Sequence, residues 1–359
     1  MGKKYKEIFE SLRKDIQEGV YAEGDFLPTE IELTKKFLVS RPTIAKALEM
    51  LRSQGSIERR SGYGTVVTPS KLSRGLRIGL LIPQLSETEI FAPICQAIED
   101  EGRLQHWDVI RPGNKEAVTD ISERTTRLCR NFIREEVDAV IFAPVEHIPQ
   151  GEHFNARILN QLQEAGIPVL LLDRDVVPWP GQSPHDLIGI DNIQAGYVIA
   201  SHLIQQGCRK LLFTTRPNPA MTVQLRIMGC REAIQHNGLP SDSLVIENIK
   251  DSAENMDIQG LMKCNPDALI CANDATAAIL MRRLLDEGVD IPGQLKVAGF
   301  DDVKYASLLS VPLTTYHQPC EDLGRTAVHA VQERIKHPHA TPQRITLQGH
   351  LIARRSTES

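Results

Sequence analysis

The chain contains 359 residues, of which 41% are hydrophobic and 24% are charged, and its formal net charge at pH 7 is −5. This length exceeds what one small hydrophobic core organises, so we expect more than one domain. Residues 1–74 hold 14 Lys and Arg against 10 Asp and Glu, whereas the remainder carries a net charge of about −9. Positive charge gathered at one end favours a local contact with phosphate groups and excludes a general polycation.

The N-terminal segment predicts two helices in succession. The first is amphipathic, because apolar residues recur at helical spacing. These residues are Tyr5, Ile8, Phe9, Leu12 and Ile16. Gly19 ends this helix. Thr29 and Glu32 form a capping box, in which hydroxyl and carboxylate bond to each other's backbone N–H groups, so a short helix begins near Glu30.

A further helix follows after a short turn. Ser40 is a good N-cap and Pro42 is tolerated in the first helical turn, so this helix begins near Arg41. Its inward-facing apolar residues are Ile44, Ala47, Leu48 and Leu51, and its outward-facing residues near the N-terminus are Arg41, Pro42, Thr43 and Lys46. In helix-turn-helix proteins this exposed end enters the major groove of DNA.

A β-hairpin is predicted directly after this helix, which Gly55 stops. Residues 57–60 and 65–67 form two short strands, and the turn between them contains Gly62 and Gly64, which accept positive φ angles. Helix, turn, helix and hairpin together predict a winged helix-turn-helix domain over residues 1–68.

Residues 3–68 resemble the winged-helix domain of GntR-type transcription regulators. The resemblance rests on the segments LPTE, SR-x-T, AL-x₂-L and G-x-GT, which occur here in the family's order. It implies that Arg41 and Thr43 contact bases and phosphate, and that a wing tip enters the minor groove. The full set of DNA-binding residues that we predict is Thr29, Ser40, Arg41, Pro42, Thr43, Lys46, Gly62, Tyr63 and Gly64.

Two positions depart from the family pattern. Ile31 stands where an arginine is usual, and Ala45 stands where a second arginine is common. We therefore expect an operator that differs from the commonest family sequence, with Lys46 taking over part of the contact. The alternative is a winged helix used for a protein contact.

Residues 69–76 are polar and include Pro, Ser and Gly, so they predict a linker of modest reach. Beyond it, short apolar runs alternate with amphipathic helices, which indicates parallel sheets covered by helices. The predicted strands span residues 77–82, 138–143, 167–173, 210–215, 267–272 and 295–300, and the predicted helices include 91–105, 193–206 and 275–287.

Polar residues follow three of the predicted strands. Asp173 follows one strand, Asn273 and Asp274 follow a second, and Asp301 and Asp302 follow a third. In open parallel sheets ligands bind outside the carboxyl ends of the strands. The sequence therefore predicts a polar ligand pocket at these strand ends.

Residues from about 77 to 354 resemble the effector domain of LacI/GalR regulators, a two-lobed α/β domain of the type I periplasmic-binding-protein fold, and we expect this domain to span residues 77–359. The motifs IGLLIP, DAVIFAP, IPVLLLDR, IGIDN-x₂-AG, ALICAND, VAGFDD and PLTT-x₂-QP carry the resemblance, in the family's order. It implies a first lobe of about 77–188 with 318–346 and a second lobe of about 189–316 with 347–355.

The effector-binding residues implied by the resemblance are Phe91, Asp173, Arg226, Asn273, Asp274, Asp301 and Gln318. Arg226 falls where the family grips sugar hydroxyls or a carboxylate. Asp274 could instead cap a helix that begins at Ala275. We expect structural roles for Asp302 and Trp107, and either a pocket lid or a loop anchor for Trp179.

The pairing of a GntR-type reader with a LacI-type effector domain resembles the arabinose repressor class. It implies a ligand-responsive bacterial repressor of carbohydrate-utilisation genes that binds a palindromic operator as a homodimer. A small sugar or polyol would close the two lobes and shift the paired winged helices through its differential affinity for the two states. Two alternatives stay open: a cytosolic sugar sensor that acts through a protein partner, and a carbohydrate enzyme with a DNA-like appendage.

The sequence contains no recognisable catalytic or metal motif. The segment Gly62–Gly64 is the only G-x-G and lacks a third glycine, and no G-x₄-GK[ST], HExxH or G-x-S-x-G occurs. The 7 cysteines form no CxxC pair and the 11 histidines show no zinc spacing. We expect no enzymatic activity, cofactor or metal. Because no apolar run approaches the roughly 18 residues of a membrane span, and no signal-peptide pattern occurs, we expect a cytoplasmic protein without a membrane partner.

Overall fold

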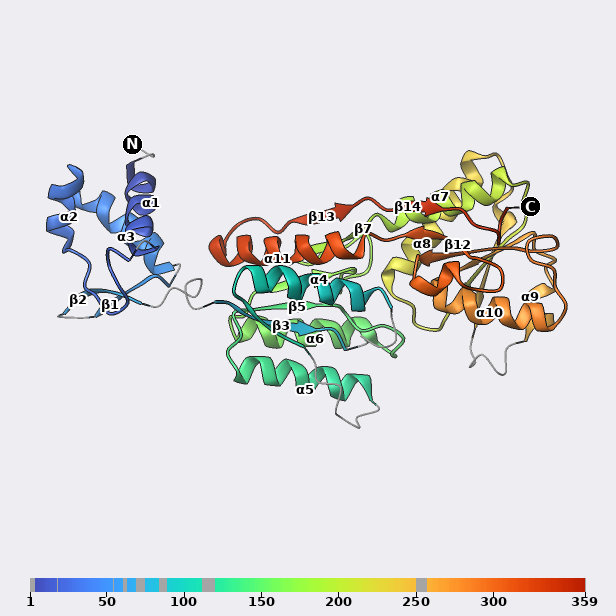
Figure 1. The fold of residues 1–359 in the computed structure, drawn as a ribbon, viewed down its shortest axis with the longest axis horizontal. Helices are drawn as coiled ribbons and strands as arrows, with labels where there is room; N and C mark the ends of the chain where they lie inside the picture. The colour runs from blue at the N-terminus through green and yellow to red at the C-terminus, as the bar shows by residue number, and fades with distance from the viewer. Residues whose placement is uncertain are drawn as a thin grey trace.

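The computed structural model describes residues 4–17, 19–53, 55–60, 63–68, 75–83, 89–111, 120–249 and 257–358. The N-terminal domain consists of α1 (Lys4–Gln17), α2 (Glu30–Phe37), α3 (Arg41–Ser53), β1 (Ile57–Arg60) and β2 (Gly64–Val67). The two strands pair antiparallel as a hairpin (Figure 1). Gly62 and most of the predicted linker lie outside the described residues.

The capping box at the start of α2 is confirmed. Glu32 donates its backbone N–H to Thr29 Oγ1 at 3.3 Å, and Thr29 donates its backbone N–H to Glu32 Oε2 at 2.7 Å. The Thr29 backbone bond lowers the pKa of Glu32. At the other end of α2, Leu38 adopts a left-handed conformation with φ 51° and donates to Thr34 O. The capping box at Thr29 fixes the start of α2, and Leu38 ends it. The helix α3 therefore follows directly after a short turn, as the helix-turn-helix prediction requires.

The first lobe contains a six-stranded parallel sheet in the order β13-β7-β6-β5-β3-β4. Its strands are β3 (Arg77–Leu81), β4 (Asp108–Ile110), β5 (Ala139–Phe142), β6 (Val169–Leu172), β7 (Asp186–Ile190) and β13 (Arg344–Leu347). Helices α4 (Phe91–Leu104) and α11 (Cys320–Lys336) cover one face, and α5 (Ile121–Arg134) and α6 (Gly151–Glu164) cover the other (Figure 1).

The second lobe repeats this plan with the strand order β14-β12-β11-β10-β8-β9, in which only β14 runs antiparallel. Its strands are β8 (Leu211–Thr215), β9 (Leu244–Asn248), β10 (Ala268–Cys271), β11 (Lys296–Asp301), β12 (Thr314–His317) and β14 (His350–Ile352). Its helices are α7 (Asn192–Gln205) and α8 (Met221–His236) on one face, and α9 (Ile258–Met262) and α10 (Asp274–Asp286) on the other.

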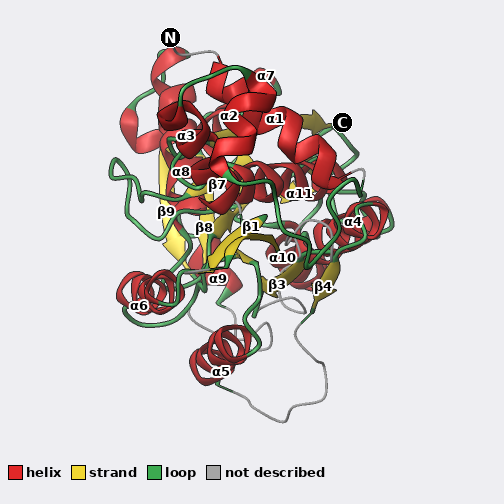
Figure 2. Cartoon of the chain, turned by 90° about the vertical axis from the view of Figure 1, so that its left-hand side faces the viewer, coloured by secondary structure: helices red, strands yellow, loops and turns green. Residues whose placement is uncertain are grey.

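A continuous apolar core runs through both lobes on the face that α4, α11, α7 and α8 cover. Separate cores lie beneath α5 and α6 in the first lobe and beneath α9 and α10 in the second. Viewed along the long axis, α4 and α11 lie on one side of the strands, and α6 lies on the other (Figure 2). Each predicted strand and helix of this region is confirmed to within two residues at either end.

Within the described residues the chain passes between the lobes at 190–192, at 317–320 and at 347–350. The carboxyl ends of the parallel strands of both sheets therefore meet at the junction of the lobes. Polar side chains that follow these strands are brought together there, although they lie far apart in the sequence.

Candidate functional site

Arg41, the first residue of α3, lies at the surface of the winged-helix domain. Its side chain is 69% exposed, and its Nε donates to Glu30 Oε2 at 2.7 Å. Arg59 Nη1 lies 3.9 Å from the other carboxylate oxygen of Glu30. The first residue of α2 thus holds one arginine of α3 and one of the wing strand on the exposed side of the domain.

The other predicted DNA-binding residues occupy the same helix end and the wing. The hydroxyls of Ser40 and Thr43 lie 2.9 Å apart. Lys46 Nζ lies 4.4 Å from the ring centroid of Tyr5, a cation–π contact that the sequence did not predict. On the wing, Tyr63 is 81% exposed and Gly64 has a φ of 123°, a conformation that favours glycine.

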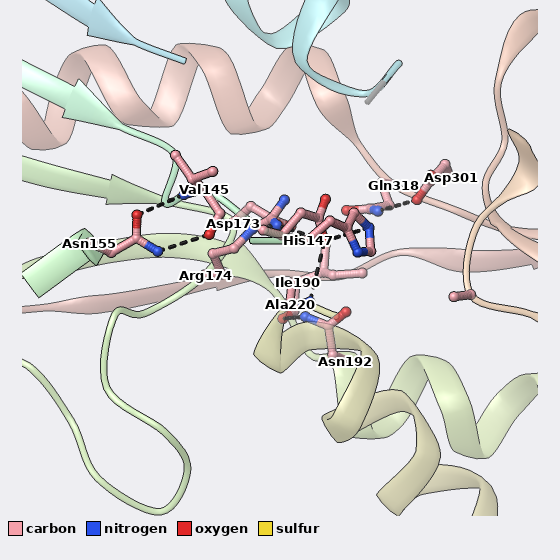
Figure 3. Close-up of polar contacts among 12 residues, drawn as sticks. Val145, His147, Asn155, Asp173, Arg174, Ile190, Asn192, Ala220, Asp301 and Gln318 are labelled. Atoms are coloured by element: carbon pink, nitrogen blue, oxygen red, sulfur yellow. Dashed lines mark hydrogen bonds and ion pairs between the residues drawn. The ribbon is translucent and has the colours of Figure 1, made fainter. Parts of the chain in front are cut away.

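Around the junction of the lobes, six of the predicted effector-binding residues are buried: Phe91, Asp173, Arg226, Asp274, Asp301 and Gln318. Gln318 Nε2 donates to Asp301 Oδ1 at 2.7 Å, and Arg226 Nη2 lies 3.9 Å from the same oxygen. Figure 3 shows Asp173, Gln318 and Asp301 in this junction. The structure therefore brings buried polar residues from both lobes together. We call this group the junction cluster; it consists of Asp173, Arg226, Asp301 and Gln318, with Asn192, Arg174 and Glu146.

The side chain of Arg226, in α8, is held by two hydrogen bonds and a contact with an aromatic ring. Its Nε donates to Asn192 Oδ1 at 2.9 Å, and its Nη1 donates to the carbonyl of Ala272 at 2.6 Å. The guanidinium also lies 4.5 Å from the ring centroid of Phe300. Asn192, at the start of α7, is a member of the junction cluster that the sequence did not predict.

Two members of the junction cluster lie at strand ends of the second lobe. Asp301 is the last residue of β11, and Gln318 follows β12 where the chain crosses to the first lobe. Burial raises the pKa of Asp301 to about 7, although the Arg226 guanidinium opposes this shift. Asp301 also has a φ of 114°, in the left-handed region. Gln318 Oε1 is buried without a hydrogen-bond partner among the described residues. A bound molecule with a hydrogen-bond donor would satisfy this acceptor.

Two further charged residues, Glu146 and Arg174, belong to the cluster and were missed from the sequence. Arg174 is buried between Asp173, with Nε 2.9 Å from Oδ2, and Glu146, with Nη1 3.0 Å from Oε2. Its guanidinium lies 5.7 Å from the ring centroid of Phe91. Burial is the largest single influence on Glu146 and opposes its ionisation. The Arg174 charge, the neighbouring His147 and the hydrogen bonds from Arg174 and Ala220 together outweigh burial and lower the pKa of the carboxyl. Glu146 follows a predicted strand just as Asp173 does, so the strand-end rule could have found it.

The alternative that Asp274 caps a helix beginning at Ala275 is wrong. Asn273 is the N-cap, since its Oδ1 accepts from Thr276 N at 2.8 Å, and α10 begins at Asp274. Asp274 itself is fully buried and accepts from Thr315 Oγ1 at 2.7 Å and Val303 N at 3.1 Å. Burial, reinforced by Asp301, raises its pKa well above the usual range.

Two cavities adjoin the junction cluster. The larger has a volume of about 1040 Å³ and is lined in part by Asp301 and Gln318. The smaller, of about 230 Å³, is lined in part by Asp173, Arg174 and Asn192. Asn273 and Asp274 line neither cavity. The junction cluster thus presents polar groups to both cavities.

Three other residues whose roles were predicted from the sequence lie outside the junction cluster. Asp302 accepts from Arg354 Nη2 at 2.6 Å and lies 2.9 Å from His317 Nδ1, and it also lines the larger cavity, so its structural role stays a prediction. Trp107 is 9% exposed and packs in the core, as expected. Trp179 is 53% exposed and borders the smaller cavity.

Within the described ranges, no group of three or more His, Cys, Asp or Glu side chains is arranged to hold a metal ion. All seven cysteines are free thiols. None of the described helices has both the length and the apolar character needed to cross a bilayer.

Comparison with known proteins matches both parts of the chain. Residues 4–67 match the family model of bacterial regulatory proteins of the gntR family, and residues 200–357 match that of the periplasmic-binding-protein-like domain. The chain is a transcription regulator with a gntR-family DNA-binding domain and a periplasmic-binding-protein-like effector domain. The regulators of this class are not enzymes, so the carbohydrate-enzyme alternative is set aside.

Two relatives match nearly the whole length of this regulator. The HTH-type transcriptional repressor PurR of Aliivibrio salmonicida is 25% identical over 90% of this chain and 97% of its own length. The arabinose metabolism transcriptional repressor of Geobacillus stearothermophilus is 23% identical over 93% of this chain and 91% of its own.

The effector-domain fold also matches solved structures. A LacI family transcriptional regulator from Enterococcus faecium, solved with bound ribose, superposes with a TM-score of 0.64 at 23% identity. The match covers 78% of this chain and 98% of that one. At this identity the likeness establishes the fold of the regulator's effector domain.

Proposed function

We propose that this regulator is a transcriptional repressor of carbohydrate-utilisation genes whose effector is a small, uncharged sugar or polyol bound between the two lobes. The observation that carries the proposal is the junction cluster, in which both lobes contribute buried polar side chains next to open cavities. The arabinose repressor that matches both domains, and the ribose-bound regulator that shares the effector fold, support the same ligand class.

The hydrogen-bonding groups of the cluster favour a hydroxyl-rich molecule. Gln318 Oε1 needs a donor, whereas the arginines and Asn192 can donate to a ligand oxygen. A hydroxyl group both donates and accepts, so one sugar ring can satisfy several of these groups at once. A ligand that lacked such groups would leave buried polar atoms unpaired, which is costly.

The charges of the cluster argue against an anionic effector. Asp173, Glu146 and Asp301 face two guanidinium groups, those of Arg174 and Arg226. The positive charges are already matched by carboxylates, so none is left over for a phosphate or carboxylate group. A sugar phosphate would bring additional negative charge into a low-dielectric site and would bind less well than the free sugar.

We further propose that the regulator binds a two-fold symmetric operator as a homodimer, with Arg41 and Thr43 at base edges and phosphate and the wing in the minor groove. A dimer presents two winged helices to two half-sites.

A thermal-shift panel of the full chain tests the ligand class. We expect neutral pentoses, hexoses or polyols to raise the melting temperature, because a molecule that binds only the folded state stabilises it. The matching sugar phosphates and purines should not. Arg226→Lys should abolish the shift, since lysine lacks the planar fork of arginine, and Arg231→Lys, on the exposed side of α8, should retain it. Stabilisation by sugar phosphates or purines alone would contradict the proposed class.

A further inference from the structure

A second set of polar contacts joins the lobes away from the chain crossings. His147 of the first lobe donates its backbone N–H to Asn218 O at 2.9 Å, and its Nδ1 lies 2.9 Å from Pro217 O. Ala220 of the second lobe donates its backbone N–H to Glu146 Oε2 at 3.3 Å. Figure 3 shows His147 and Ala220 at this junction.

The loop that carries Glu146 and His147 is firmly held in its own lobe. Asn155 of α6 accepts from Val145 N and donates to Val145 O, both at 2.9 Å (Figure 3). His147 has a φ of 60° and its partner Asn218 a φ of 48°, so both residues lie in the left-handed region. Such conformations persist where the surrounding contacts determine them. The two loops are therefore shaped to meet.

Glu146 also connects this contact to the effector side of the junction cluster. The same Oε2 that accepts from Ala220 lies 3.0 Å from Arg174 Nη1. Ala220 is the N-cap of α8, and no side-chain hydrogen bond of its own caps this helix. A carboxylate is favoured at a helix N-terminus, so Glu146 supplies from the opposite lobe what α8 lacks. Because α8 carries Arg226, one side chain touches both the first-lobe arginine and the helix of the second-lobe arginine.

We propose that Glu146 and His147 form a clasp that holds the lobes together before an effector binds, with Glu146 as the positioning residue that couples Arg174 to α8. The clasp is made by contacts between protein groups, and only its regulatory role rests on the proposed function. A protein that already populates the closed arrangement binds its effector more tightly, because a smaller share of the binding free energy is spent on closure.

Hydrogen exchange of the full-length protein without any ligand tests the clasp. The amide of Ala220 is protected by a carboxylate of the other lobe, so its exchange rate reports the contact directly. The decisive pair is His147→Asn and His147→Asp. Both residues tolerate a left-handed backbone, but only asparagine can donate to Pro217 O. The exposed neighbour His153, changed to Asn and to Asp, provides the matched control.

We expect His147→Asp to raise the exchange rate of Ala220 by about tenfold, the effect of losing one hydrogen bond across the lobes. His147→Asn and both His153 variants should exchange like the wild type. Glu146→Gln should also raise the rate at Ala220, since it removes the charge that favours the α8 N-terminus. Exchange in β10, in the core of the second lobe, should stay unchanged in every variant.

Equal rates at Ala220 in His147→Asp, His147→Asn and the wild type would overturn the clasp. Faster exchange throughout β10 in His147→Asp would overturn it too, because the residue would then serve the stability of the second lobe. Neither sugar nor DNA enters this experiment, so its failure is distinct from a failure of the proposed function.

Discussion

Arg41 is paired with Glu30 in the DNA-free protein, yet most of its side chain is open to solvent. If it reads a guanine, Arg41→Ala should weaken operator binding by about 1–3 kcal/mol, the usual value of a bidentate arginine contact. Fluorescence anisotropy with a labelled operator measures this. The thermal shift by sugar should not change, because Arg41 lies in the other domain.

Arg52→Ala provides the control for Arg41. Arg52 lies in the last turn of the same helix, is exposed and pairs with Glu49 at 3.1 Å. We expect a much smaller loss of operator affinity from this variant. Equal operator affinity of Arg41→Ala and the wild type would remove Arg41 from the reading surface.

Asp301 gives the protein a specific dependence of stability on pH. Its pKa is about 7 in the folded protein against 3.8 ordinarily, so the folded state binds a proton that the unfolded state releases. Its contribution to stability is complete below about pH 4 and is lost as the pH rises through 7. Asp301→Asn keeps an oxygen for Gln318 but cannot ionise.

We therefore expect the urea midpoint of the wild type to fall relative to that of Asp301→Asn between pH 4 and 8. The difference between the two proteins reports Asp301 together with its effect on Asp274, whose raised pKa Asp301 reinforces. The contributions of the more distant carboxyl groups are shared. Parallel midpoint curves over this range would show that the raised pKa is absent.

Several residues of the junction cluster could be predicted because each follows an apolar strand or lies in a recognisable motif. Asp173, Arg226 and Asp301 are examples. Asn192 was missed, since its importance depends on neighbours that come from distant segments. Glu146 was missed although it follows a predicted strand. Asn273 and Asp274 are both residue types that favour the N-cap position. Asn273 is the N-cap because the Asp274 side chain is buried and bonded to Thr315, a contact that the local sequence does not show.

At the scale of elements, the close crossing of α7 and α8 sets the position of Arg226. A Cβ added to Gly229 would lie 1.9 Å from Ile193 O, and one added to Gly196 would lie 1.9 Å from Arg226 O. The two glycines let the helix backbones approach. Gly229→Ala should therefore destabilise the protein by about 1–3 kcal/mol, as overpacking does in well-packed cores.

Urea unfolding measures the effect of Gly229→Ala, and the sugar-dependent thermal shift should weaken with it because α8 moves. Glu232→Ala, at an exposed position of the same helix, serves as the control. Unchanged stability of Gly229→Ala would mean that the two helices can separate at little cost.

Six of the eight interior strands were predicted from their apolar runs, whereas the interior strands β7 and β12 and the edge strands were not. β4 has three residues, and β13 and β14 are only partly buried. Short, half-exposed strands lack the continuous apolar pattern of strands covered on both faces. Their pairing depends on the sheet that they join, so it emerges only in the folded lobe.

For the whole molecule, length and the uneven distribution of charge predicted separate domains, and the family motifs predicted their kinds. The clasp between Glu146, His147 and the loop at 217–220 could not be predicted, because it depends on how two lobes meet. The spacing of apolar residues within each lobe predicts its helices and strands, but it does not predict how close the two lobes lie.

We propose that one molecule couples a sugar site to operator binding. The most direct test is to select binding sites for the full chain from random DNA, and then to titrate the selected site with and without the sugar that raises the melting temperature. We predict a two-fold symmetric site whose affinity changes several-fold with that sugar and stays unchanged with its phosphate. Selection of no sequence, or an affinity that the stabilising sugar leaves unaltered, would contradict the account.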